Sequence, residues 1–172
     1  IKDDSILVFT PEPVQAFADS QYSQHQEFHL AHNASLVLLD WFSSGRVARG
    51  ERWAFKHLES RNDIFVGGER ALVDPLLLSS DELAERMGRF NCLATLLLIG
   101  PAVKTATDDL LQQLAARPVE KQATLNFSAS PVRGGALIRV AGEEVELVRR
   151  ELSGHLGFLR DILGDDPWAR KW

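Results

Sequence analysis

Short apolar runs separated by polar breaks dominate the first half of the chain, at the spacing of a β protein. Residues 5–9, 22–30, 64–66 and 69–78 combine aliphatic or aromatic side chains with turn residues at their ends, which predicts strands. Residues 36–39 (LVLL) are continuously apolar, so we expect this strand to be buried on both faces. Together these segments predict a layer built from strands.

The strand at residues 36–39 leads into a loop that contains two glycines. Asp40 follows the apolar run, Gly45 and Gly50 punctuate the loop, and residues 51–58 return to a strand-like mixture of side chains. Two strand segments joined by a glycine-containing connection predict a hairpin-type unit.

Turn residues divide the other strands of this half. Residues 61–63 (RND) predict a turn, and Gly67 and Gly68 end the strand before them. Pro75 follows Asp74 and cannot donate to a strand ladder, so this pair of residues predicts a sheet edge or a bulge.

The second half mixes strands with helical patterns. Its periodicity predicts strands at residues 91–99, 123–128 and 135–140, and helices at residues 79–88, 105–117 and 143–163. Ser80 and Thr107 are the predicted N-caps of the first two helices, and Pro118 and Gly164 follow the ends of the later two. We therefore expect a mainly β fold with two helices, 105–117 and 143–163, beside a short helical turn at 79–88, in one domain over residues 1–172.

Composition and charge narrow the class of protein. A chain of 172 residues can bury a sizeable core, and a net charge of -5 argues against a broad nucleic-acid footprint. Cys92 is a single cysteine, so it forms no internal disulfide, which favours a reducing compartment and a cytoplasmic location. The longest apolar run, residues 93–99, is too short to span a membrane.

Opposite charges crowd the glycine loop and allow two interpretations. Arg46 and Glu51 are placed to form a structural ion pair that holds the loop, as such networks often do. Alternatively, Asp40, Arg46 and Glu51 together form the site of an all-β small-ligand-binding protein or enzyme. The residue pattern alone leaves both open.

Other groups that carry chemistry give weaker signals. His25 and His29 share one face of a predicted strand, but without a close-spaced set of further ligands we expect ordinary surface histidines. Cys92 lies in an apolar strand, where a thiol is usually inert. The sequence contains no phosphate loop, nucleophile elbow or zinc-ligand spacing, so it favours a binding or scaffold protein over a catalyst.

Two stretches of the chain resemble the urease accessory proteins of the UreD (also called UreH) family, in particular eukaryotic members. The first stretch, residues 11–24, has the pattern PxPVxxFxxSxYxQ. The second combines Leu39-Asp40-Trp41, Ser44-Gly45-Arg46, Arg49-Gly50-Glu51 and Trp53. The resemblance covers the larger carboxy-terminal part of the family, and we expect the family's amino-terminal strands to lie outside this chain.

The resemblance implies a function in urease maturation without catalysis. Family members bind apo-urease and join a UreF-family accessory protein, which recruits a UreG-family GTPase, and together these proteins deliver nickel to urease. The implied fold is a layered, partly helical-coil arrangement of strands with two helices. No tightly bound cofactor is implied, although nickel would pass in transit, and neither nucleic acid nor a membrane is an expected partner.

The resemblance also implies roles for particular residues. The motif residues are expected to shape the loop: Asp40, Gly45, Arg46, Gly50, Glu51 and Trp53. A water-filled nickel passage has been proposed for the family, and its polar groups here would be Asp40, Glu51 and Asp74. Docking of the UreF-type partner is expected on apolar residues of the last helix and the tail, namely Leu156, Leu159, Leu163, Trp168 and Trp172. The tryptophans could equally fold back on the domain.

Overall fold

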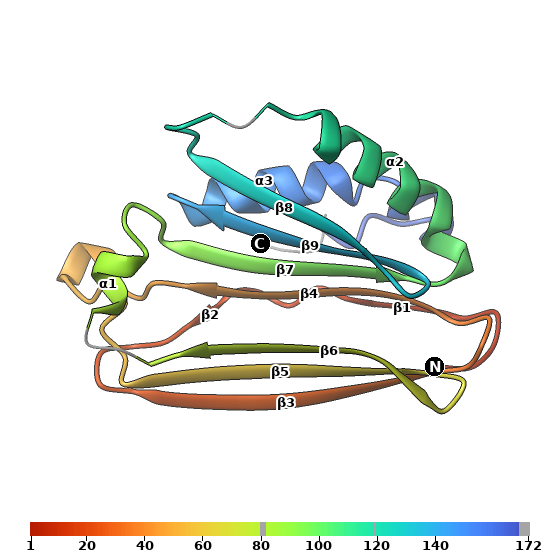
Figure 1. Ribbon diagram of the computed structural model, residues 1–172, viewed down its shortest axis with the longest axis horizontal. Helices are drawn as coiled ribbons and strands as arrows, with labels where there is room; N and C mark the ends of the chain where they lie inside the picture. Colours follow the sequence, from red (N-terminus) through yellow and green to blue (C-terminus); the bar gives the residue numbers. More distant parts are fainter. Residues whose placement is uncertain (80–81, 119, 169–172) are drawn as a thin grey trace.

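Two β-sheets stack face to face, and helices cover the outer face of the larger sheet (Figure 1). This computed structural model describes residues 1–79, 82–118 and 120–168. The larger sheet has the order β1 (Ile6–Phe9), β4 (Ser35–Ser43), β7 (Cys92–Ile99), β9 (Gly135–Gly142) and β8 (Leu125–Val132), with β2 (Val14–Gln15) also paired to β4. The smaller sheet has the order β3 (Gln21–Leu30), β5 (His57–Val66) and β6 (Glu69–Leu78).

The helices fall into two long and two short ones among the described residues. The long helices are α2 (Lys104–Ala116) and α3 (Val145–His155), and the short ones are α1 (Leu83–Arg86) and α4 (Leu159–Leu163). Single 3-10 turns at Val47–Arg49 and Pro101–Val103 complete the described helical segments. The prediction of a mainly β fold with two substantial helices is confirmed. None of the helices in the described part of the chain is both long and apolar enough to cross a bilayer.

β4 is an interior strand of the larger sheet, and all of its residues are buried. Val37, Leu39 and Trp41 pack in the core beneath α2 and α3, whereas Leu36 and Leu38 face the core between the sheets. This two-sided burial explains the continuous apolar run, because neither face of the strand meets water. Each such side chain contributes roughly 1.5–3 kcal/mol by its burial.

The predicted hairpin between residues 36–39 and 51–58 is wrong. β4 and β5 belong to different sheets, and residues 51–56 form no strand. Both hydrogen-bonding edges of β4 are already occupied, one by β1 and β2 and the other by β7. No edge remains for the following segment, so the connection crosses to the second sheet.

The predicted turn at residues 61–63 is also wrong, because these residues lie inside β5. Tertiary contacts override their turn preference: the Asn62 amide donates to Asp40 across the interface, and Asp63 Oδ2 lies 3.0 Å from His25 Nε2 on β3. The predicted edge at Pro75 is confirmed, since β6 is an outer strand of the smaller sheet.

Two helix predictions need correction. Thr107 lies inside α2, where its hydroxyl donates to the Val103 carbonyl oxygen, and the N-cap position is Val103. The predicted helix over residues 143–163 is broken into α3 and α4, because the chain turns at residues 156–158, beside Gly157. Gly164 ends α4 in the left-handed conformation, as expected. The predicted N-cap Ser80 lies outside the described residues.

Candidate functional site

A row of polar side chains crosses the inner face of each sheet at directly paired positions. In the larger sheet the row is Asp40, Thr95 and Arg139. In the smaller sheet it is Gln26, Asn62 and Asp74. We call these six residues, together with Gln24 and Ser60, the polar belt.

Asp40 is the centre of the polar belt, and the residue is only about 6% exposed. The Gln24 amide donates to Asp40 Oδ1 at 2.9 Å, while the Ser60 hydroxyl and the Asn62 amide donate to Oδ2 at 2.6 and 3.0 Å. Every one of these donors comes from the opposite sheet. Burying a polar group is costly unless it is hydrogen-bonded, and these donors satisfy both oxygens of the Asp40 side chain.

Tyr22 extends the belt along β3. Its hydroxyl donates to Gln24 Oε1 at 2.6 Å, and burial together with the nearby charge of Asp40 raises its pKa above the usual value of 10.0. The phenol is therefore neutral at physiological pH and acts as a donor.

Asp74 and Arg139 form an ion pair between β6 and β9 at the other side of the belt. Asp40, Asp74, Thr95 and Arg139 line one cavity of about 90 Å³ between the sheets. Arg139 is about half exposed, so the cavity lies next to solvent on this side. Two carboxylates and one guanidinium leave the cavity with a net negative charge, which suits a cation.

The polar belt separates two apolar clusters between the sheets. One cluster includes Leu36, Leu38 and Ile64, and the other includes Phe42 and Leu58. A polar layer inside an apolar interface costs desolvation free energy, so it is not explained by packing alone. It marks the interface as a functional candidate.

The glycine loop lies beyond one end of β4 and is held by the predicted ion pair. Arg46 Nε donates to Glu51 Oε2 at 3.0 Å, and a second guanidinium nitrogen donates to Oε1 at 2.6 Å. The same carboxylate accepts from the Ala18 backbone N–H, and the guanidinium stacks on Phe17. These bonds lower the pKa of Glu51 below its usual value of 4.5, mainly through Arg46.

Backbone geometry explains the motif glycines. Gly45 has a φ of +102°, and a Cβ there would lie 2.5 Å from the Glu51 carbonyl oxygen. Gly50 ends the 3-10 turn with a φ of +76° in open space. Trp53 is buried, with its indole N–H donating to the Phe90 carbonyl oxygen at 2.9 Å. The loop is therefore tied to the rest of the fold at both ends.

The structure divides the predicted site residues. Asp40 and Asp74 share the belt cavity, as a passage would require, but Glu51 lies outside it. Asp40 is likewise separate from Arg46 and Glu51, whose contacts are within the loop and with residues 17–18. A single site formed by Asp40, Arg46 and Glu51 is therefore not present.

Most of the predicted docking residues are not surface residues in this chain. Leu156 and Leu159 are fully buried in the core beneath the larger sheet, and Trp168 packs partly buried against the same core. Leu163 is exposed, together with its neighbour Ile162. Trp172 lies outside the described residues. Leu156 and Leu159 thus pack in the core, and among the described residues after 143 the end of α4 exposes the large apolar side chains Ile162 and Leu163.

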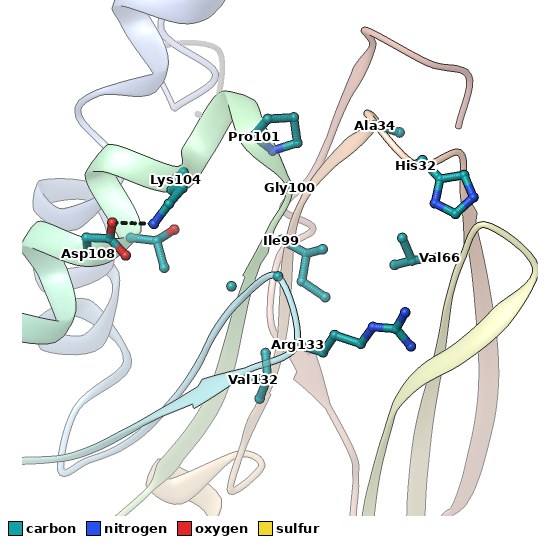
Figure 2. Close-up of a pocket in the computed structure, with 13 residues that line it drawn as sticks. His32, Ala34, Val66, Ile99, Gly100, Pro101, Lys104, Asp108, Val132 and Arg133 are labelled. Carbon is teal, nitrogen blue, oxygen red and sulfur yellow. Dashed lines mark hydrogen bonds and ion pairs between the residues drawn. The ribbon is translucent and has the colours of Figure 1, made fainter.

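A second cavity, of about 470 Å³, lies at one end of the sandwich, where several strand ends meet (Figure 2). Lys104 and Arg133 line it, but Lys104 pairs with Asp108 and Arg133 with Glu69. Their positive charges are already compensated, and none of the predicted site residues lines this cavity.

Sequence reasoning missed Ser60, Asn62 and Arg139 as parts of the site. A signal was present in the alternation Leu58, Ser60, Asn62 and Ile64, which places two polar side chains on the same face as two apolar ones. The prediction of a turn at residues 61–63 concealed that pattern.

The comparisons with known proteins all indicate the same family. The model of the UreD urease accessory protein family matches residues 1–172. The urease accessory protein UreD of Sorangium cellulosum is 50% identical over 176 residues, which cover 100% of this chain and 55% of that protein. The UreD of an Anaeromyxobacter species is 40% identical over 169 residues, covering 96% of this chain and 57% of that protein.

A plant relative extends the comparison. The urease accessory protein D of Arabidopsis thaliana is 29% identical over 198 residues, which cover 98% of this chain and 67% of that protein. The similarity is therefore not confined to eukaryotic members. The chain spans just over half the length of the two bacterial relatives.

Proposed function

Because the chain belongs to the UreD family of urease accessory proteins, we propose that it is a non-catalytic maturation factor that helps deliver nickel to apo-urease. In this proposal it is a scaffold that binds apo-urease and a UreF-family protein, and the latter brings the UreG-family GTPase. The free, buried thiol of Cys92 fits work in the cytoplasm. The observation that carries the proposal is the polar belt between two otherwise apolar sheets.

The belt has the chemistry that suits a nickel ion in transit. Asp40 and Asp74 offer carboxylate oxygens to one cavity, whereas a storage site for nickel would need imidazole or thiolate ligands. The hydrogen bonds to Asp40 lower its strength as a ligand, and Arg139 competes for Asp74. Weak ligands allow an ion to leave as readily as it enters, which is what transfer requires.

The glycine loop supports a structural role for the motif residues. Both oxygens of the Glu51 carboxylate are occupied by Arg46, and one of them also by the Ala18 N–H. The Arg52 guanidinium donates to the carbonyl oxygens of Ala84 and Phe90, which ties the loop to α1 and the start of β7. These groups are already paired, so we assign them to shaping a surface and not to binding nickel.

The end of α4 is the surface that we assign to the UreF-type partner. Ile162 and Leu163 are exposed apolar side chains on this helix, next to the buried Leu159. Deletion of residues 143–172 would not test this assignment, because α3 carries the core residues Val148 and Leu152. Surface substitutions are the suitable test.

The experiment measures complex formation and urease nickel content with the full-length protein. We expect the wild type to capture the UreF-family protein of the same organism, and a variant with both Ile162→Asp and Leu163→Asp to lose capture. Leu77→Asp is the matched control, because Leu77 is exposed on the opposite layer. Equal capture by all three proteins would remove α4 from consideration.

A separate variant tests the proposed nickel passage through the polar belt. We expect Asp40→Asn combined with Asp74→Asn to retain the UreF-type partner and to leave urease with less nickel. Urease that reaches its full nickel content without this protein would overturn the proposed function as a whole.

A further inference from the structure

Two histidines and two carboxylates gather on the outer face of the smaller sheet, away from the polar belt. His25, Glu27 and His29 alternate along β3 and point to the same face. Asp63 on β5 is the residue paired directly with Glu27. No described element covers this face (Figure 1).

The ligand atoms of three of these residues converge. His25 Nε2 lies 3.0 Å from Asp63 Oδ2 and 3.9 Å from Glu27 Oε1. One ligand atom from each of His25, Glu27 and Asp63 lies within 4.8 Å of the others. Ligand atoms around a tetrahedral ion with bonds of about 2.0–2.2 Å stand about 3.3–3.6 Å apart. Small side-chain movements would therefore bring all three onto one ion.

We propose that His25, Glu27 and Asp63 form a surface site for a divalent transition-metal ion, with His29 as its positioning residue. Imidazole combined with carboxylate suits ions such as nickel and zinc. The choice of nickel as the natural ion rests on the proposed function, whereas the site itself rests on this geometry.

Asp63 is prepared as the anchoring ligand. Its side chain is only 2% exposed, and Arg61 Nε donates to both carboxylate oxygens at 3.1 Å. The guanidinium therefore holds the carboxylate in place beside the His25 ring, whose Nε2 lies 3.0 Å from Asp63 Oδ2. An ion at Oδ2 leaves Oδ1 to accept from Arg61 Nε, which then fixes the orientation of the carboxylate.

His29 orients Glu27 from the other side. Its Nε2 lies 3.3 Å from Glu27 Oε2, the oxygen that does not face His25. The ring is fixed by stacking on Phe65, with the centroids 4.6 Å apart and the planes 3° from parallel. Glu27 is thus held between two imidazoles.

Exposure and charge make the site exchangeable. The side chains of His25 and Glu27 are 52% and 50% exposed, so an ion reaches them directly from solvent and water completes its coordination. The positive charge of Arg61 offsets one of the two carboxylates, which weakens the attraction for a divalent ion. An open, weak site of this kind collects metal and releases it.

The test is titration of the untagged full-length protein with nickel chloride by calorimetry, in a buffer that does not bind metal. We expect His25→Gln and Glu27→Gln to weaken binding by at least about tenfold, a loss that outer-shell changes alone can reach. His57→Gln is the matched control, because His57 lies on β5 of the same sheet and its Nε2 is 3.7 Å from Glu59 Oε2, outside the proposed site. Asp40→Asn tests whether any of the measured binding comes instead from an ion in the polar belt.

The outcomes are distinct. Binding that is lost in His25→Gln and Glu27→Gln but kept in His57→Gln supports the site, as does nickel-induced broadening of the His25 ring resonances. Wild-type protein that binds no nickel, or binding lost only in Asp40→Asn, would overturn it. Neither of these results affects capture of the UreF-type partner, so this site can fail while the proposed scaffold function stands.

Discussion

Asp74 on β6 and Arg139 on β9 form an ion pair that joins the two sheets across the belt cavity. Arg139 lies in register with Thr95, and Thr95 with Asp40, so the pair continues a polar line that runs across the strands of the larger sheet. The interface between the sheets therefore has two apolar parts separated by a charged line. This arrangement fixes how the sheets face each other, because a shift of one residue would bury Arg139 against apolar side chains.

The first prediction concerns the hydrogen bonds of Asp40. Asp40→Ala leaves the buried donors of Ser60 and Asn62 without their acceptor, at a cost of about 1–3 kcal/mol for each unsatisfied donor. We expect the free energy of unfolding to fall by about 2–6 kcal/mol. Asp40→Asn keeps the shape and one acceptor oxygen, so its loss should be smaller. Urea denaturation measures both, and an alanine variant as stable as the wild type would contradict the role assigned to the belt.

The second prediction compares two glycines of the same loop. Gly45→Ala places a Cβ 2.5 Å from one backbone oxygen and 2.9 Å from another, at a positive φ, whereas Gly50→Ala meets no atom within 4 Å. The positive φ alone costs about 1–3 kcal/mol at either position, so the excess in Gly45→Ala reports the close packing of the loop. Thermal denaturation of the two variants checks this order. Equal destabilisation would show that the loop can relax around the added methyl group.

The strands were predictable because their signal is local. The alternation in residues 22–30 and the continuous apolar runs at residues 36–39 and 93–99 each depend only on the faces that a segment buries. The carboxylates were also visible locally, since Asp40 and Asp74 interrupt otherwise apolar strands. A charge at such a position requires a partner, and the sequence therefore indicated that a polar site exists.

The partners of those carboxylates were not predictable, because they depend on which strands pair. β3 pairs in parallel with β5, although β4 lies between them in the chain. This crossover brings Ser60 and Asn62 opposite Asp40, and it brings Asp63 beside His25. Non-local pairing of this kind leaves no trace in residue spacing, which is why the histidines of β3 looked isolated.

Most of the predicted docking residues lie in or against the core for a related reason. Leu152, Leu156 and Leu159 have the spacing of an apolar helix face, and such a face fits either a partner or the chain's own sheet. Here the outer face of the larger sheet needs cover, and these leucines provide it. Whether such an apolar helix face is exposed depends on whether a sheet surface is available to pack against it, and not on the helix itself.

The third prediction is a pH effect at Glu51. Its pKa is lowered in the folded state, so the charged form stabilises the fold above about pH 4.5 and this contribution is lost as the pH falls through the lowered value. Glu51→Gln should therefore be less stable than the wild type at neutral pH, and the difference should shrink below pH 4.5. Urea midpoints at several pH values test this. Glu69→Gln is the control, since Glu69 and Arg133 form an exposed pair that contributes little.

The fourth prediction concerns the reactivity of Cys92. The thiol is fully buried on β7, and burial raises its pKa to about 12, so the reactive thiolate is scarce at pH 8. We expect a thiol reagent to label the native protein only through opening of the larger sheet, at a rate that does not change with reagent concentration once labelling is fast. Urea should increase that rate in step with unfolding. Rapid labelling proportional to reagent concentration in native buffer would show instead that β7 is accessible without unfolding, and that the sheet beneath α2 and α3 opens locally.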